Sequence, residues 1–301
     1  MTLNRGFTYH AHVASTARGQ TLAAWLSATY THSPIAEWAK RLARAEVALD
    51  GRVATGDETL RAGQNVAWMR PPWHEAEVPL TFELVHEDAH VVAVAKPSGL
   101  PTMPAGGFLD HTLLALVRAR FGTVHPAHRL GRFTSGLVLF ARTRPAAATL
   151  AAAWRSHEVT KDYRALVVGD PDWTRRDITT PIGPVPHGVV GSVHAASPTG
   201  RAAHTVAGVR ERRGDVTLCD VRITTGRPHQ IRIHLASVGY PLAGDPLYAP
   251  GGQPFAGTRA LPGDGGYLLH AHRLRLAHPD ASGTLALEAE PPPPLRDAAT
   301  G

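Results

Sequence analysis

The stretch that decides the fold is His128-Arg129-Leu130-Gly131-Arg132-Phe133-Thr134-Ser135-Gly136-Leu137. Its first part is polar and contains glycine, which predicts a loop, whereas residues 136–141 are an apolar run typical of a buried strand. Pro145 then stands where it suits the first turn of a following helix. The stretch therefore predicts a loop of polar side chains that leads directly into the core of an α+β domain.

The surrounding sequence alternates between strand and helix patterns from about residue 80 to residue 290. We expect further strands at 90–95, 161–168, 216–224, 267–276 and 284–288, and helices at 111–121 and 228–238. Residues 250–266 are rich in glycine and proline, which predicts a surface loop. The C-terminal residues 291–301 contain four consecutive prolines and are predicted to form a disordered tail.

Residues 20–70 predict a separate small module that contains both helices and strands. Apolar residues recur at helical spacing in two consecutive segments, first at Leu22 to Ala28 and then at Ile35 to Ala45. Asp50-Gly51 predicts a tight turn between two short strands. Because 70–72 (Arg-Pro-Pro) is typical of a linker, we expect one domain at 1–75 and a second at 76–290.

The composition limits the cell compartment and the class of partner. The chain has 301 residues with 31 basic and 25 acidic side chains, and a net charge of +6 favours polyanions such as nucleic acid. No apolar run approaches the ~18 residues that span a bilayer, and the first twenty residues lack the apolar core of a secretory signal. The single cysteine, Cys219, cannot form an internal disulfide. We therefore expect a cytoplasmic protein with no membrane association.

Four further motifs accompany the central stretch in a fixed order. They are Lys96–Leu100 (KPSGL), Lys161–Val167 (KDYRALV), Thr225–Leu235 (TGRPHQIRIHL) and Gly244–Tyr248 (GDPLY). Together the five motifs closely resemble the RluA-type family of RNA pseudouridine synthases, over roughly residues 85 to 275. The N-terminal module is similar, more loosely, to an S4 RNA-binding domain, which often precedes the catalytic domain in this family.

The resemblance implies both a fold and a reaction. The implied fold is the pseudouridine synthase fold, a mixed and largely antiparallel sheet with flanking helices, preceded by an S4-like α/β module. The implied reaction isomerises uridine to pseudouridine in ribosomal or transfer RNA: the base is detached at its N-glycosidic bond, rotated and rejoined through carbon, without a cofactor. The uridine must first leave the RNA stack, and contacts between the base and the pocket offset the free energy that this unstacking costs. RNA is the expected partner, and a monomer is the default expectation.

The resemblance also assigns roles to residues. The pocket of the family uses an aspartate at the sugar, a tyrosine that stacks on the base, and a basic residue that pairs with the aspartate. Tyr163 and Arg232 stand at the positions of the tyrosine and the basic residue. The position of the aspartate is occupied by Gly131, which has no side chain to attack the sugar or move a proton. The alternative hypothesis is therefore a catalytically inactive RNA-binding protein derived from the family; the retained Tyr163 and Arg232 favour the enzyme.

A buried Arg232 without its carboxylate would be costly, so we expect that another acid reaches in, that the pocket is wetter, or that an anion such as RNA phosphate supplies the charge. Asp110 precedes the first helix of the domain and is our speculative substitute. It ranks above Asp162, because strand alternation turns Asp162 away from the face of Tyr163. Asp245, in the last motif, is expected to hold a turn through its side chain.

Several basic and polar residues are expected to contact RNA. In the catalytic domain they are Lys96, Arg129, Arg132, Thr134, Lys161, Arg227 and His229, and in the N-terminal module Lys40, Arg41, Arg44 and Arg52. The alternative to an RNA contact is that Lys96 is the solvated end of a strand and that the basic residues of the module form a solvated helix face. His10/His12 and His270/His272 have a strand spacing that suits metal, but no third ligand matches, so we predict no metal site.

Overall fold

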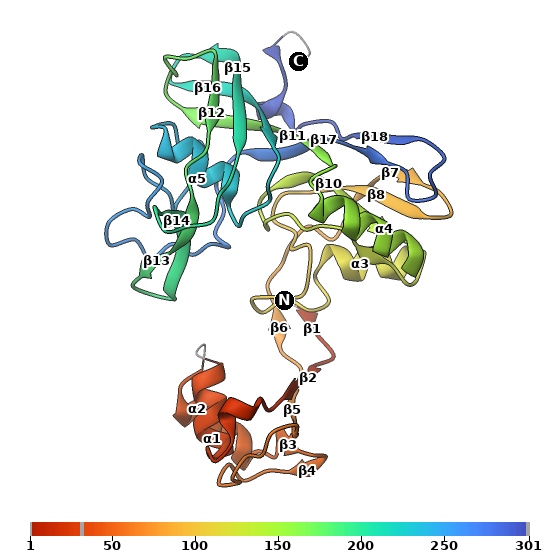
Figure 1. Cartoon of the computed structure of the whole chain (residues 1–301), viewed down its shortest axis with the longest axis vertical. Helices are drawn as coiled ribbons and strands as arrows, with labels where there is room; N and C mark the ends of the chain where they lie inside the picture. Colours follow the sequence, from red (N-terminus) through yellow and green to blue (C-terminus); the bar gives the residue numbers. More distant parts are fainter. Residues whose placement is uncertain (1, 31–32, 299–301) are drawn as a thin grey trace. The chain divides into compact units, whose positions relative to one another are not determined.

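The computed structural model describes residues 2–30 and 33–298, and the chain forms two compact units, residues 1–76 and 77–301. The first unit is red to orange and the second orange to blue in Figure 1. Within the described ranges, no helix has the length and apolarity needed to cross a bilayer.

The first unit is a small α/β module. Its elements are β1 (Thr2–Leu3), β2 (Phe7–His12), η1 (Ser15–Ala17), α1 (Leu22–Thr29), α2 (Ile35–Ala43), β3 (Val47–Leu49), β4 (Arg52–Val53), β5 (Asn65–Arg70) and β6 (His74–Glu75). The four-stranded sheet has the order β2-β5-β3-β4, and β1 pairs with β6. Leu22, Trp38 and Leu42 of the two helices pack with Val47 and Val66 of the sheet. The helical spacing of the apolar residues thus places both helices on one face of the sheet.

The second unit is built on a ten-stranded mixed sheet. Its strands are β7 (Glu83–Glu87), β8 (Val91–Lys96), β9 (His125–Pro126), β10 (Ser135–Ala141), β11 (Thr160–Val168), β12 (Arg175–Ile178), β15 (Thr205–Arg213), β16 (Val216–Ile223), β17 (Leu269–Ala277) and β18 (Thr284–Glu288). The order is β12-β15-β16-β11-β17-β10-β8-β7, with β9 beside β10 and β18 beside β17. A separate hairpin comprises β13 (Ile182–His187) and β14 (Gly191–Ala196). The predicted α+β class with a mixed, largely antiparallel sheet is confirmed.

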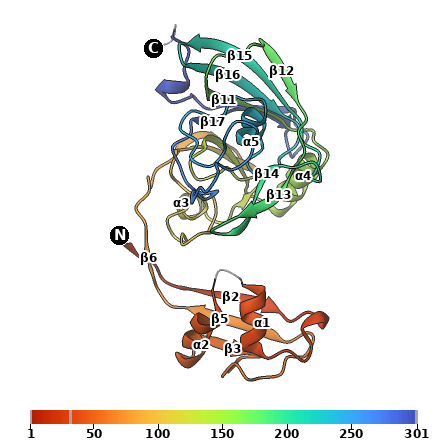
Figure 2. The same cartoon turned by 90° about the vertical axis from the view of Figure 1, so that its left-hand side faces the viewer.

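Helices cover both faces of this sheet. They are α3 (Leu113–Phe121), α4 (Arg144–Arg155), α5 (Gln230–Ser237) and the short η2 (Pro293–Leu295) (Figure 1, Figure 2). Leu150 of α4 packs with Leu137 and Leu139 of β10, whereas Val117 of α3 packs with Val138 of the same strand. Because successive side chains of a strand point to opposite faces, an uninterrupted apolar run is what a strand covered on both faces requires.

The pairing of β10 with β17 sets the position of the loops that precede these strands. The two strands are parallel, with Ser135 opposite His270 and Gly136 opposite Ala271. Gly136 has φ +104°, and a Cβ atom there would lie 2.2 Å from the carbonyl oxygen of Ala271. Both strands run in the same direction, so their N-terminal ends lie side by side. The segment 128–134, which precedes β10, and Tyr267, which precedes β17, therefore lie at the same end of the strands.

The C-terminal segment differs from the expectation of disorder over 291–301. Within the described part of this segment, Leu295 is buried against Leu166 of the sheet, and Asp297 forms an ion pair with Arg210. The physical reason is that one leucine reaches an apolar site, while the flanking prolines limit the conformational entropy that ordering costs. Residues 299–301 lie outside the described residues.

A cluster of histidines and aspartates joins the β7–β8 turn to the β17–β18 turn. The Asp88 carboxylate accepts hydrogen bonds from Nε2 of His86 at 2.6 Å and Nε2 of His278 at 3.0 Å, and from the backbone N–H groups of His90 and Val91. Partial burial alone would raise the pKa of Asp88, but these hydrogen bonds outweigh it and hold the pKa well below its usual value.

We expect Asp88→Asn to destabilise the protein in a pH-dependent way. A carboxylate whose pKa is lowered on folding contributes stability above its unfolded pKa of about 3.9, and this is lost as the pH falls through the folded pKa. Urea denaturation should therefore show a large difference between wild type and variant at pH 6 that shrinks below pH ~4. The control is Asp215→Asn, an exposed aspartate of the same unit. A difference that stays constant down to pH ~2 would contradict this account.

Gly136→Ala should destabilise the second unit, because the added Cβ overlaps the backbone of β17 and the positive φ disfavours alanine. We expect the free energy of unfolding in urea to fall by about 2–4 kcal/mol. Gly188→Ala is the matched control, since a Cβ at Gly188 meets nothing within 4 Å. Equal stability of the two variants would show that the β10–β17 contact can shift without cost.

Candidate functional site

A cavity of about 120 Å³ lies at the N-terminal ends of the neighbouring strands β10 and β17. Five segments line it: the loop before β10, Tyr163 of β11, the end of β16, the start of α5 and the segment before β17. The lining residues are Arg129, Leu130, Gly131, Thr134, Tyr163, Ile223, Arg227, His229, Gln230, Ile231, Arg232, Tyr267 and Leu269. Tyr163 and Arg232, which lie 69 positions apart in the sequence, thus face one hollow together with Gly131.

The buried Arg232 has a carboxylate partner, and that partner is Asp245. Nε and Nη2 of Arg232 donate to the two carboxylate oxygens of Asp245 at 2.7 and 2.8 Å, and Nη1 donates to the carbonyl of Pro262 at 3.1 Å. Burial opposes the positive charge, but the hydrogen bonds and charge of Asp245 outweigh it and raise the pKa of Arg232. Asp245 also accepts from the N–H groups of Leu247 and Tyr248, so it combines the expected turn contact with charge neutralisation.

The two acids that we considered from the sequence lie elsewhere. Asp110 is not among the residues that line the cavity. Asp162 is bound by Arg222, with Nε at 2.7 Å from the carboxylate, in an exposed ion pair on the β11–β16 pair. Among the described residues that line the cavity, none is an aspartate or a glutamate.

The space next to Gly131 is occupied by a tyrosine hydroxyl. A Cβ atom on Gly131 would lie 3.1 Å from Oη of Tyr267 and 3.5 Å from Oγ1 of Thr134. These two hydroxyls are 3.4 Å apart, and the guanidinium of Arg232 lies 4.2 Å from the centre of the Tyr267 ring. Tyr267 therefore contacts the cation and lies against the place where the side chain of an acid at position 131 would begin. Tyr267 belongs to none of the five sequence motifs and has the pattern of an ordinary strand residue, so no local signal marks it as part of the site.

Tyr163 stands where two apolar clusters meet, one beneath α3 and one beneath α5. On β11 it pairs with Val221 on one side and Ala271 on the other. Burial raises the pKa of Tyr163 to about 12, so the phenol stays protonated at neutral pH. It can stack and donate a hydrogen bond, but it is not available as a phenolate base.

His229 lines the cavity with a neutral imidazole. Tyr248 uses its single hydroxyl hydrogen to donate to the carbonyl of His194 at 2.7 Å, so its oxygen accepts from Nδ1–H of His229, also at 2.7 Å. Burial, together with the charge of Arg232, lowers the pKa of His229 to about 3. The imidazole is therefore neutral, with Nε2 as an acceptor. His229 has φ +54°, a left-handed conformation that is costly for histidine and often marks functional residues.

Lys96 positions the loop instead of lying free at its surface. Its side chain is 1% exposed, and Nζ donates to the carbonyls of Pro97, Leu100 and Arg132 at 2.7–2.9 Å. Burial and the neighbouring charge of Arg132 lower the pKa of Lys96 to about 7. The buried Lys96 thus connects the first motif to the loop that contains Gly131. Both a solvated strand end and a direct RNA contact require an exposed side chain, so the structure contradicts these two interpretations of Lys96.

The other residues expected to contact RNA fall into two groups. Arg129, Thr134, Arg227 and His229 line the cavity. Lys161 is buried outside the lining, and Arg132 donates from Nε to the carbonyl of Gly99 at 3.0 Å. The contact of Arg129 or Arg227 with RNA remains a prediction that follows from their place at the cavity.

In the first unit, the predicted basic residues have different surroundings. The guanidinium of Arg41 lies over the rings of Trp38 and Trp68, at 4.5 and 4.2 Å from their centres. Lys40 and Arg44 are exposed and form only peripheral ion pairs, with Glu37 and Glu46 at 3.7 and 4.0 Å; Arg52 is also exposed. Exposed cations of this kind contribute little to stability and stay available to phosphates.

Comparison with known proteins identifies clear relatives. Residues 90–237 match the RNA pseudouridylate synthase family. The chain is 40% identical over 272 residues to an uncharacterized RNA pseudouridine synthase of Synechocystis sp., covering 89% of this chain and 93% of the relative. It is 33% identical over 279 residues to ribosomal large subunit pseudouridine synthase D of Pseudomonas aeruginosa, covering 86% and 83%. The solved structure of human RNA Pseudouridylate Synthase Domain Containing 1 is similar with a TM-score of 0.57 and 25% identity, covering 74% of this chain and 89% of that chain.

Asp245→Asn tests the energetic role of the buried pair. Removing one partner leaves the Arg232 charge uncompensated, so we expect the free energy of unfolding in urea to fall by about 3–5 kcal/mol. The control is Asp162→Asn, which breaks an exposed pair with Arg222 and should cost less than about 1 kcal/mol. A small effect of Asp245→Asn, equal to that of the control, would mean that water or another group compensates Arg232.

Proposed function

Because the chain belongs to the RluA family of RNA pseudouridine synthases, we propose that it isomerises uridine to pseudouridine within ribosomal or transfer RNA. The observation that carries the proposal is the single cavity lined by Tyr163, Arg232 and the loop around Gly131. A relative named as a ribosomal large subunit enzyme supports RNA of the ribosome as one substrate class. We propose action as a cytoplasmic monomer, without a cofactor.

The reaction requires two bonds to break and two to form, and its net result is an isomerisation. The bond between N1 of uracil and C1′ of ribose breaks, the base turns, and C5 bonds to C1′ while the C5 proton leaves and N1 is protonated. In our assignment the base enters the cavity against Tyr163, whose protonated phenol donates a hydrogen bond. Nε2 of His229, an acceptor, receives the imino N–H of the base. Arg232, neutralised by Asp245, supports the wall formed by Tyr267.

The ribose has to be met by a group other than a carboxylate at position 131. Among the lining side chains, the Tyr267 hydroxyl lies nearest to the place where an acid on Gly131 would begin. We assign Tyr267 to the contact with the ribose, assisted by the Thr134 hydroxyl at 3.4 Å. The guanidinium of Arg232, 4.2 Å from the centre of the Tyr267 ring, supports this ring by a cation–π contact.

The second candidate function is binding of RNA without chemistry. The specific observation in its favour is that no carboxylate is present among the described residues lining the cavity. In this case the cavity would hold an extruded base, and the protein would act on RNA structure alone.

A map of pseudouridines in ribosomal and transfer RNA separates the two functions. RNA from cells that lack the gene is compared with RNA from cells complemented by the wild-type gene or by Tyr163→Phe. A site that disappears on deletion and returns only with the wild type supports the enzyme. A map that is unchanged by the deletion, together with RNA that co-purifies with the protein from complemented cells, supports the binder.

We expect Tyr267→Phe to reduce the rate of pseudouridine formation about 10²-fold or more, the usual contribution of a positioned proton donor or acceptor. RNA affinity should stay unchanged, because the ring is retained. Adding Gly131→Asp to Tyr267→Phe should restore activity, since the carboxylate then has room in place of the hydroxyl. The matched control is Gly131→Asn/Tyr267→Phe, which has the same shape without the acid. A fully active Tyr267→Phe variant would contradict the assignment.

A further inference from the structure

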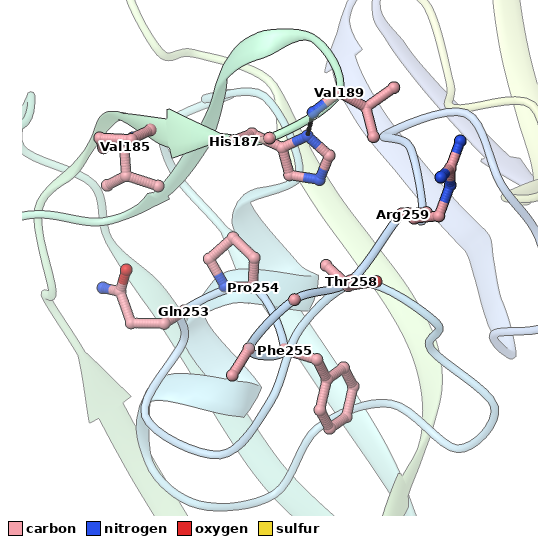
Figure 3. Close-up of a pocket in the computed structure, with 12 residues that line it drawn as sticks. Val185, His187, Val189, Gln253, Pro254, Phe255, Thr258 and Arg259 are labelled. Carbon is pink, nitrogen blue, oxygen red and sulfur yellow. Dashed lines mark hydrogen bonds between the residues drawn. The ribbon is translucent and has the colours of Figure 1, made fainter.

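A second and larger cavity lies between the β13–β14 hairpin and the loop 250–262. Its volume is about 490 Å³. Figure 3 shows the residues that matter here: Val185, His187 and Val189 on the hairpin, and Pro254, Phe255 and Arg259 on the loop. None of them belongs to the site described above.

His187 lines this cavity and has a buried hydrogen-bond donor. The residue is 8% exposed, and its Nδ1 accepts a hydrogen bond from the backbone N–H of Val189 at 3.3 Å. Because an accepting Nδ1 has no proton, the proton of the neutral ring is on Nε2. Among the described residues, Nε2 of His187 has no hydrogen-bond partner. A buried donor without an acceptor costs free energy, so a ligand with a carbonyl or ring-nitrogen acceptor would satisfy it.

The rest of the lining fits a nucleotide. Pro254 and Val185 provide apolar walls. Within the described part of the chain, Arg259 has neither an ion pair nor a hydrogen bond, so its guanidinium is free to bind a phosphate. Phe255 is 43% exposed on the same loop, and a solvent-facing ring is a surface on which a base can stack.

The loop that forms this cavity also contacts the site. At its C-terminal end, the carbonyl of Pro262 accepts a hydrogen bond from Nη1 of Arg232 at 3.1 Å. The hairpin is linked as well, because the carbonyl of His194 on β14 accepts from the Tyr248 hydroxyl, which is bonded to His229. Both walls of the second cavity are therefore attached to residues of the first.

We propose that this cavity binds one unpaired nucleotide of the RNA, separate from the uridine that enters the first cavity; the inference rests on the proposed function. The base accepts a hydrogen bond from Nε2–H of His187 between the apolar walls. Arg259 binds the phosphate of that nucleotide, and Phe255 stacks on the next base along the strand. The enzyme thus requires a single-stranded segment longer than the target uridine itself.

Photochemical cross-linking of the full-length protein tests the proposal. The probe is a single-stranded oligouridylate of about ten nucleotides that contains 5-iodouridine, within the site size usual for single-strand binding surfaces. We expect cross-links at His187 or Phe255, identified by peptide mass spectrometry. Arg259→Gln and His187→Ala should lower the yield of this cross-link at least about fivefold. The matched control Arg175→Gln, an exposed arginine of the same unit, should leave it unchanged.

The outcomes are distinct from those of the proposed function, because cross-linking does not need catalysis. Cross-links confined to residues outside the second cavity would overturn the inference even if the pseudouridine map supports the enzyme. A cross-link at His187 or Phe255 that disappears in Arg259→Gln would support it even if the map is unchanged. Equal yields in wild type and both cavity variants, with unchanged thermal unfolding, would also overturn it.

Discussion

The contact between β10 and β17 is the constraint on which the site depends. The two parallel strands approach so closely at Gly136 that a side chain there would overlap the backbone at Ala271. Their common direction brings the loop of Gly131 and the residue Tyr267 to one edge of the sheet, and β11, antiparallel to β17, adds Tyr163 from the other side. The three hydrogen bonds of the buried Lys96 then hold that loop in place. Backbone pairing, more than any side-chain contact, therefore determines which groups share the cavity.

Much of this arrangement could be predicted from the sequence. The apolar runs gave the positions of β8, β10, β11, β16 and β17, and the motifs placed Tyr163, Gly131 and Arg232 together. Burial of Arg232 correctly required a carboxylate, but the choice of Asp110 could not anticipate the real partner. Asp245 reaches Arg232 because the turn after α5 folds back, and a turn residue that also neutralises a charge has the same local pattern as one that does not.

Other features depend on tertiary contacts that no local pattern contains. The hairpin β13–β14 and strands β12 and β15 mix exposed and buried positions, with prolines and glycines among them, so their periodicity is weak. Lys96 looks like a surface residue until three carbonyls surround it. The segment around Leu295 looks disordered until the apolar site beside Leu166 is known. The carbonyl of Arg132 that binds Lys96 and the side chain of Leu166 that packs on Leu295 are both distant in sequence from their partners.

The hydroxyl of Tyr267 beside Gly131 also constrains how this protein can change over generations. A single substitution that brought an acid back to position 131 would meet that hydroxyl at 3.1 Å, so it would arrive together with a steric penalty. The hydroxyl would have to move by a few tenths of an ångström, or be lost by substitution of Tyr267, to make room for the new side chain. A carboxylate at position 131 is therefore accommodated more easily after a change at Tyr267 than before it, so the residues allowed at one of these neighbouring positions depend on the residue present at the other.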